Sequence, residues 1–161
     1  MSPNRISKLT RVAAFLLLGA GTSAEAQTGE RTAIMSLLSS YEAALNASNT
    51  AAVMPLYADD AVFMPPNSQP AVGAAAVRQA YEGVFKAIKL DLKFTVAEVV
   101  QVAPEWAFAR THSAGTVTVN AAGAKIAEAN QELFILKKAA DGAWKIARYS
   151  FSTTKPPAQQ Q

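Results

Sequence analysis

The amino-acid sequence predicts an α+β domain in which a cone-shaped, curved antiparallel sheet wraps around a long N-terminal helix. Apolar residues recur at helical spacing as far as residue 88 and alternate with polar residues from Lys89 onward. The later segments are long and separated by short turns, so consecutive strands should pair antiparallel rather than form βαβ units. A chain of 161 residues, 50% hydrophobic and 17% charged, suits one globular domain.

The first 26 residues have the three-part layout of a secretory signal peptide. A basic stretch at residues 1–11 precedes an apolar run at residues 12–20, and small residues follow with the spacing Ala24-x-Ala26. The apolar run has about half the length that a helix needs to cross a membrane. We therefore expect cleavage after Ala26, a mature protein that begins at Gln27 and is periplasmic or secreted, and no membrane attachment after cleavage.

Charge and composition exclude several classes of partner and cofactor. Most of the net charge of +3 comes from the leader, so the remaining chain lacks a basic patch for nucleic acid. The absence of cysteine excludes disulfides, thiolate metal sites and cysteine nucleophiles. With His112 as the one histidine, no metal site is expected. No phosphate-binding loop or dinucleotide fingerprint occurs, so no cofactor is expected.

Three helices are predicted in the first half of the domain. The first spans residues 28–47, with Ile34, Leu38, Tyr41 and Leu45 on its apolar face. A short second helix covers residues 51–57 and is distorted by Pro55. The third begins after Gly73 and continues to residue 88.

Five strands complete the prediction, at residues 61–64, 90–103, 106–119, 127–138 and 143–154. Asp59 and Asp60 are predicted to turn the chain before the first strand. They could act as paired carboxylates in acid/base chemistry, but capping of the turn is favoured. The domain is expected to span residues 27–154, and residues 155–161, which contain two prolines, are expected to be disordered.

Alternation along the last strand separates its two faces. Lys145 is expected outside, which places Trp144 and Arg148 inside and Tyr149 and Phe151 on the convex outer face. Large apolar rings on an outer face need a partner, and Leu133 and Ile135 of the neighbouring strand share this face. We therefore expect a homodimer that forms through the convex side of the sheet.

The order of elements and four short motifs resemble the SnoaL-like superfamily, the cone-shaped fold of nuclear transport factor two, ketosteroid isomerase, scytalone dehydratase and the SnoaL cyclases. The motifs are YEAALN at residues 41–46, LYADDAVF at residues 56–63, Gly73, and GAWKIAR at residues 142–148. Within the superfamily the chain looks closest to the SgcJ/EcaC group, whose members are named oxidoreductases. This fold hosts enzymes, binding proteins and assembly domains, so the site must indicate the function.

Some site residues of ketosteroid isomerase have a counterpart in this sequence, and its catalytic base does not. Tyr41 matches its oxyanion tyrosine, and Glu132 falls near its second oxyanion acid. The position of its catalytic base is occupied by Pro65, which has no proton to move. Steroid isomerisation by that mechanism is therefore not expected. Scytalone dehydratase uses several histidines, and this chain has one.

The candidate site residues each have a functional and a structural interpretation. Tyr41 could donate its phenol to an oxyanion or be an ordinary core tyrosine. Arg148 is predicted to point inward and could pair with Glu132. The pair could hold a polar group of a substrate, or it could be a structural salt bridge. His112 could act as a catalytic base or lie on the surface. The predicted pocket walls are Trp106, Phe63, Met64, Val77, Tyr81 and Phe134.

Two functions remain open from the sequence. In the first, the cone binds a small, largely apolar molecule without turnover, which the missing base at Pro65 favours. In the second, the protein is a cofactor-independent isomerase, lyase or cyclase, or an SgcJ/EcaC-type oxidoreductase, acting on a small carbonyl or polycyclic compound. Tyr41 and Glu132 would then polarise the carbonyl while His112 moves a proton.

Overall fold

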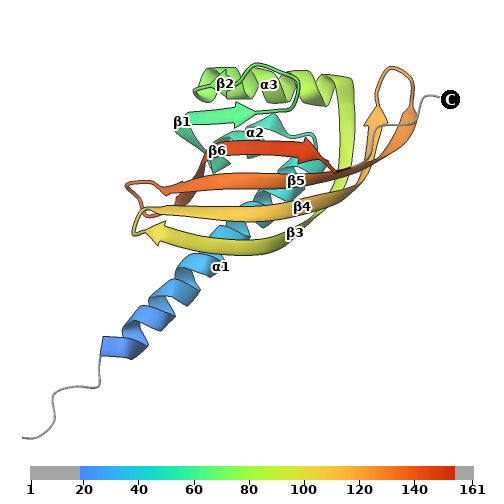
Figure 1. Cartoon of the computed structure of the whole chain (residues 1–161). Helices are drawn as coiled ribbons and strands as arrows, with labels where there is room; N and C mark the ends of the chain where they lie inside the picture. Colours follow the sequence, from blue (N-terminus) through green and yellow to red (C-terminus); the bar gives the residue numbers. More distant parts are fainter. Residues whose placement is uncertain (1–18, 155–161) are drawn as a thin grey trace, which may run out of the picture.

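The computed structural model describes residues 19–154, and within them three α-helices and a 3₁₀ turn lie against a strongly curved sheet of six strands (Figure 1). The helical elements are α1 (Gly19–Asn46), α2 (Thr50–Val53), η1 (Met54–Leu56) and α3 (Ala74–Ala87). The strands are β1 (Tyr57–Met64), β2 (Ala71–Val72), β3 (Ile88–Ala103), β4 (Trp106–Val119), β5 (Ala124–Lys138) and β6 (Trp144–Thr153). The predicted α+β class, with a curved sheet around a long first helix, is confirmed.

The sheet is mixed rather than purely antiparallel, which corrects one part of the prediction. Its strand order is β2-β1-β6-β5-β4-β3. The hairpins from β3 to β6 are antiparallel, whereas β1 pairs with β6 in parallel. This happens because α3 carries the chain from β1 and β2 to the far edge at β3, and three hairpin turns then bring β6 back beside β1 (Figure 1).

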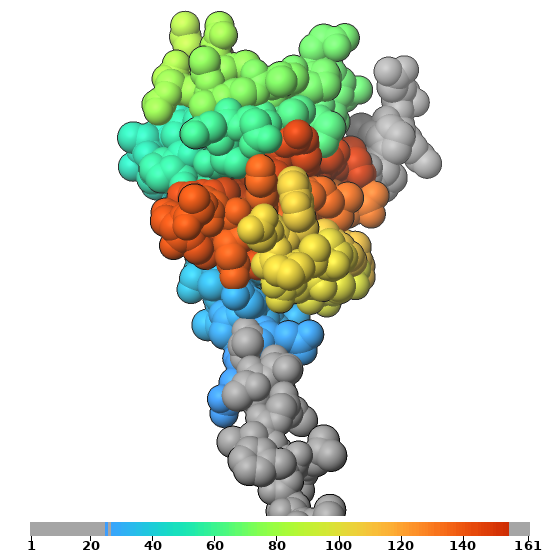
Figure 2. Space-filling model, turned by 90° about the vertical axis from the view of Figure 1, so that its left-hand side faces the viewer, coloured from blue at the N-terminus to red at the C-terminus, as the bar shows by residue number. Residues whose placement is uncertain are grey.

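The core lies between the concave face of the sheet and the helices. Ile34, Leu38, Tyr41 and Leu45 of α1 are buried, as their helical spacing predicts. Val77 and Tyr81 of α3 cover the sheet near β1. Figure 2 shows the turns that join β3 to β4 (yellow) and β5 to β6 (orange-red) side by side at one end of the sheet. The β4–β5 turn lies at the opposite end (Figure 1).

The expected turn at Asp59 and Asp60 is wrong, because both residues lie within β1. The 3₁₀ turn that contains Pro55 leads directly into the strand at Tyr57. Tyr57 is buried and its hydroxyl bonds to that of Tyr81, which fixes the start of the strand. Asp59 and Asp60 are both exposed. Capping therefore does not explain these two carboxylates.

A β-bulge in β6 reverses the expected faces of its second half. Leu136 pairs with Ile146 and Ile135 pairs with Arg148, so Ala147 is an extra residue on β6. Trp144 and Ile146 face inward as predicted. After the bulge the inward positions pass to the odd-numbered residues, so Tyr149 is buried and Arg148 is outside.

The predicted leader and tail lie largely outside the described residues. The structure does not describe residues 1–18 or 155–161, and the expected cleavage point after Ala26 falls within α1. Among the described helices, none has the length and apolar character that would let it cross a membrane.

Candidate functional site

A cavity of about 270 Å³ lies inside the wide end of the cone. It is bordered by the ends of α1 and α3 and by the concave sheet, on the side of the β4–β5 turn. Most of the wall is apolar, formed by residues that include Leu45, Phe63, Leu90, Phe94, Val117 and Phe151. The polar side chains in the wall are Tyr41, Tyr81, Tyr149, Ser113, Glu128, Asn130 and Glu132. A largely apolar cavity with a few polar groups is typical of a small-molecule site.

Three phenol groups form a buried chain beside this cavity. The Tyr81 hydroxyl lies 2.6 Å from that of Tyr41 and 2.7 Å from that of Tyr57. Burial raises the pKa of each phenol above its ordinary value, so all three stay protonated. Two hydrogen bonds use two of the three O–H protons. When Tyr57 donates to Tyr81 and Tyr81 to Tyr41, the Tyr41 proton is left for the neighbouring Tyr149 phenol or for a ligand.

Stacked aromatic rings hold these phenols in position. Phe134, Tyr149, Phe63 and Tyr81 form a column with successive centroid separations of 4.3, 5.5 and 5.0 Å. The Tyr41 ring meets Phe134 and Tyr149 edge-on, at 5.5 Å from each. Offset and edge-to-face contacts of this kind stabilise by about 0.5–1.5 kcal/mol each beyond burial. The wall on this side of the cavity is therefore rigid.

Glu132 is the buried carboxylate of the cavity wall, with 3% of its surface exposed. The hydroxyl of Thr111 donates to its Oε2 atom and that of Ser113 to its Oε1 atom, both at 2.5 Å. Burial raises the pKa of Glu132, and the two hydroxyl donors oppose that rise. Each carboxylate oxygen still has a second lone pair for a ligand.

Two further polar residues continue the same wall along β5. Glu128, Asn130 and Glu132 alternate along the strand and all line the cavity. In the orientation that satisfies its amide, Asn130 donates to Glu128 Oε1 at 2.9 Å. Ser113 on β4 pairs directly with Asn130 in the sheet. Apart from the tyrosines, the polar side chains of the cavity wall therefore lie on β4 and β5.

Several residues that the sequence proposed for the pocket are in or behind its wall. Tyr41, Glu132, Phe63 and Tyr81 line the cavity. Val77 and Phe134 are fully buried in the core outside the lining. Met64 is half-buried at the end of β1 and does not line the cavity. Pro65 is part of the lining, so the position of the family's base faces the cavity without a proton to transfer.

Three residues proposed for the pocket, His112, Trp106 and Arg148, lie on the convex outer face of the sheet and do not face the cavity. His112 is exposed on the convex side of β4, between the buried Thr111 and Ser113. Trp106 shares that convex side and is 37% exposed. Their strand was expected to turn its largest side chains inward, but the inner positions hold small residues such as Ala107 and Ala109, beneath the helices.

Arg148 is also outside, because of the bulge at Ala147. Its guanidinium donates to the backbone oxygens of Asp60, at 3.1 Å, and Ala147, at 2.6 Å. The proposed pair between Arg148 and Glu132 is therefore wrong. Glu132 is held by hydroxyl groups and not by a cation.

Sequence reasoning missed Thr111, Ser113, Asn130, Tyr57 and Tyr149. For the first three a signal was available, because alternation places Thr111 and Ser113 opposite His112 and places Asn130 beside Glu132. For Tyr149 no local signal exists, since the bulge that turns it inward leaves no mark in the sequence.

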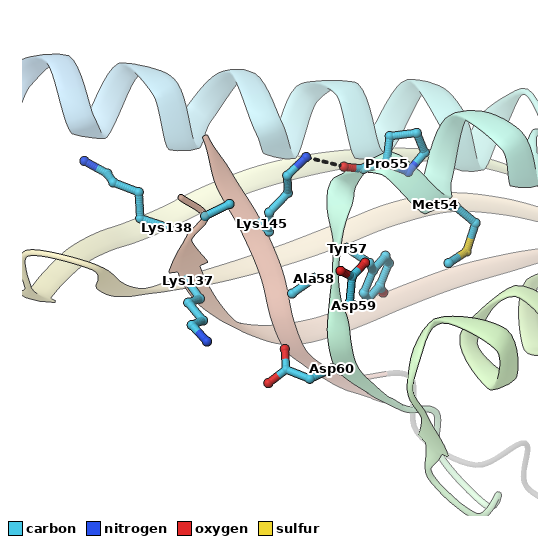
Figure 3. A pocket seen from close by; sticks show the side chains of 10 residues that line it. Met54, Pro55, Tyr57, Ala58, Asp59, Asp60, Lys137, Lys138 and Lys145 are labelled. Carbon is cyan, nitrogen blue, oxygen red and sulfur yellow. Dashed lines mark hydrogen bonds between the residues drawn. The ribbon is translucent and has the colours of Figure 1, made fainter. Parts of the chain in front are cut away.

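A second, more open hollow lies at the other end of the sheet and includes Asp59 and Asp60 (Figure 3). The two carboxylates do not point toward one another (Figure 3). Lys145 donates to the backbone oxygen of Pro55 at 2.7 Å, and Lys138 pairs with Glu30. Among the described residues, no three acidic or histidine side chains gather as metal ligands. This hollow thus lacks a converging set of reactive groups.

Comparison with known families identifies the fold family of the chain. Residues 38–158 match the model of the SnoaL-like domain. The chain belongs to the SnoaL-like domain family. The resemblance seen in the sequence is confirmed at this level, whereas membership of the SgcJ/EcaC group stays a prediction.

Solved structures agree with that assignment. A ketosteroid isomerase-like protein from Erwinia carotovora atroseptica is 38% identical with a TM-score of 0.75, over 78% of this chain and 96% of that one. An NTF2-like protein with a cystatin-like fold from Novosphingobium aromaticivorans is 17% identical with a TM-score of 0.65, over 89% and 95%. The second likeness concerns the fold alone. No curated protein matches the sequence.

Proposed function

We propose that this SnoaL-like protein binds a small, largely apolar molecule in the cavity of its cone. The observation that carries the proposal is a cavity of about 270 Å³ with a wall of aromatic and aliphatic side chains, in which Ser113, Asn130 and Glu132 of β4 and β5 supply polar groups. The apolar part of the ligand would lie against the rings, and its polar group would face Ser113, Asn130 and Glu132.

Binding of a bicyclic aromatic alcohol, 2-naphthylmethanol, tests this function by calorimetry. Val84 lines the cavity from α3, and Val84→Trp should fill the space and abolish binding. Gln79 is exposed on the same helix, so Gln79→Trp is the matched control and should bind like the wild type. Equal binding by both variants would show that the alcohol binds elsewhere and would refute the proposal.

A second candidate function is proton transfer next to a carbonyl group. It is favoured by the buried Glu132 carboxylate, whose raised pKa suits a base, and by the Tyr41 phenol in the same cavity. Glu132 would take a proton from the carbon next to the carbonyl while Tyr41 donates a hydrogen bond to the enolate oxygen. The test follows hydrogen exchange of 2-tetralone in D₂O by NMR. Exchange no faster than with Glu132→Gln would exclude this role.

Export is also part of the proposal. Among the side chains of α1 that the structure describes, Ile34 is the first that is buried, so cleavage after Ala26 would leave all of the described buried residues of the helix in the mature protein. Glu30, which bonds to Trp144, would remain as well. Intact-mass analysis of protein from the periplasm or medium should show a chain that begins at Gln27. A chain that still carries Met1 would contradict export with cleavage.

Homodimer formation is proposed through the convex face, with a corrected set of residues. Tyr149 and Phe151 face inward and leave the interface, whereas Leu133 and Ile135 remain outside. Phe108 pairs with Ile135 on this face, and Arg110 and Arg148 are further cross-strand neighbours, so the proposed interface would be partly apolar and partly charged. Light scattering should give twice the monomer mass, and Leu133→Glu should give the monomer. A monomeric wild type at micromolar concentration would refute the dimer.

A further inference from the structure

We propose that the ligand of the cavity is a hydrophobic amine, bound as an ammonium ion against Glu132. This inference rests on the proposed binding function and adds the charge of the ligand. It follows from three properties of the cavity wall: the sign of its charges, the acceptors it leaves open and its aromatic lining.

The charged residues of the wall are of one sign. Among the described residues, Glu128 and Glu132 line the cavity, and no lysine, arginine or histidine does. His112 favours the ionised form of Glu132 from the other face of the sheet, but it is exposed, so water screens its charge. The ionised form of a carboxyl group that is 3% exposed and lacks a counter-ion in the same space is unfavourable, and either protonation or a bound cation relieves the cost.

The hydrogen bonds of Glu132 also leave room for such a cation. Thr111 and Ser113 each occupy one lone pair, on different oxygens, so both oxygens can accept once more. An ammonium group has only donors and matches this acceptor set. A carboxylate or phosphate ligand would instead face two like charges on β5.

The remaining wall suits the organic part of the same ligand. Six aromatic side chains line the cavity: Tyr41, Phe63, Tyr81, Phe94, Tyr149 and Phe151. Aromatic rings attract organic cations through their negative faces, and the attraction grows when water is excluded. An acidic group within an aromatic cavity therefore selects an apolar amine over an apolar alcohol, and both over an apolar acid.

Three probes of similar shape test this order of affinities: 2-naphthylmethylamine, 2-naphthylmethanol and 2-naphthoic acid. Each is titrated into the mature protein near neutral pH. We expect the amine to bind at least about tenfold more tightly than the alcohol, and the acid to bind more weakly than either. Equal affinity of the amine and the alcohol would overturn the inference but leave the binding function intact. Failure of all three to bind would refute the binding function itself.

Variants locate the charge that makes the selection. Glu132→Gln should weaken binding of the amine much more than binding of the alcohol, and so remove the preference for the amine. Glu98→Gln is the matched control, because Glu98 is an exposed carboxylate paired with Arg110 on the other face of the sheet. Loss of amine preference in the control, or its retention in Glu132→Gln, would contradict the proposal. If Glu132→Gln does not fold, Glu128→Gln should still lower the affinity for the amine more than the affinity for the alcohol. The order of the three probe affinities on the wild type then tests the proposal.

Discussion

The two faces of strands β4 and β5 differ in a way that composition does not suggest. The outer face carries Trp106 and Phe108, whereas the inner face carries Ala107 and Ala109 at adjacent positions. The small residues on the inner face belong to the same core cluster as the buried residues of α1, which include Tyr41. The buried polar groups lie further along the inner face, where the helices withdraw and the cavity opens. Size is thus a poor guide to the buried face of a strand that lies under a helix.

The largest difference between the two faces should appear at neighbouring residues of β5. Phe134 is fully buried and stacks on Tyr149, whereas Leu133 is 45% exposed. Phe134→Ala should lower the free energy of unfolding by about 3–5 kcal/mol through loss of burial and creation of a cavity. Leu133→Ala should lower it by about 1 kcal/mol or less. Urea denaturation of both variants checks the comparison.

Protein concentration sharpens this test. Leu133 belongs to the proposed dimer face, so its effect should grow with concentration, while the effect of Phe134→Ala should not. Comparable losses at both positions in dilute protein would show that the two faces do not differ as described.

Most of the fold could be predicted because it follows from local periodicity. The amphipathic face of α1, the bounds of β4 and the turn at Asp141–Gly142 all appear in the sequence pattern. The strand direction of β1 could not be predicted, since it depends on how α3 crosses the sheet. The site was predicted in part: Tyr41 and Glu132 share the cavity, but Arg148 moved outside with one extra residue at Ala147.

Removing hydroxyl groups from the chain of buried phenols should change stability by an intermediate amount. Tyr81 makes two hydrogen bonds to buried phenols, whereas Tyr57 makes one. Tyr81→Phe leaves the buried hydroxyls of Tyr41 and Tyr57 each short of a partner. It should lower the free energy of unfolding by about 2–4 kcal/mol, roughly twice the effect of Tyr57→Phe. Thermal or urea unfolding measures both. If the two variants lose equal stability, the hydroxyl of Tyr81 is not the centre of the chain.

The smallest expected effect is on the pH dependence of stability. It concerns Glu30 and Glu132, whose environments shift the pKa in opposite directions. The ammonium of Lys138 and the indole N–H of Trp144 lower the pKa of Glu30 below its ordinary value of 4.5. Burial raises the pKa of Glu132 above the same value. The ionised form is therefore favoured by folding at Glu30 and the protonated form at Glu132.

These directions fix the sign of the pH dependence at each site. The contribution of Glu30 is present above about pH 4.5 and is lost as the pH falls through its lower folded-state pKa. The contribution of Glu132 is present below about pH 4.5 and is lost as the pH rises through its raised folded-state pKa.

Replacing each acid by its amide therefore should change stability with opposite pH trends. Glu30→Gln should be progressively more destabilising as the pH rises from about 3 to 7, because the stabilising ionised form is then missing. Glu132→Gln should become less destabilising over the same range, because the amide avoids placing a charge in the cavity. Urea unfolding of wild type and both variants across this range gives the two trends. Trends of the same sign would mean that Glu132 keeps its charge in the fold as readily as Glu30, and the description of its wall as an unfavourable site for an unpaired anion would be wrong.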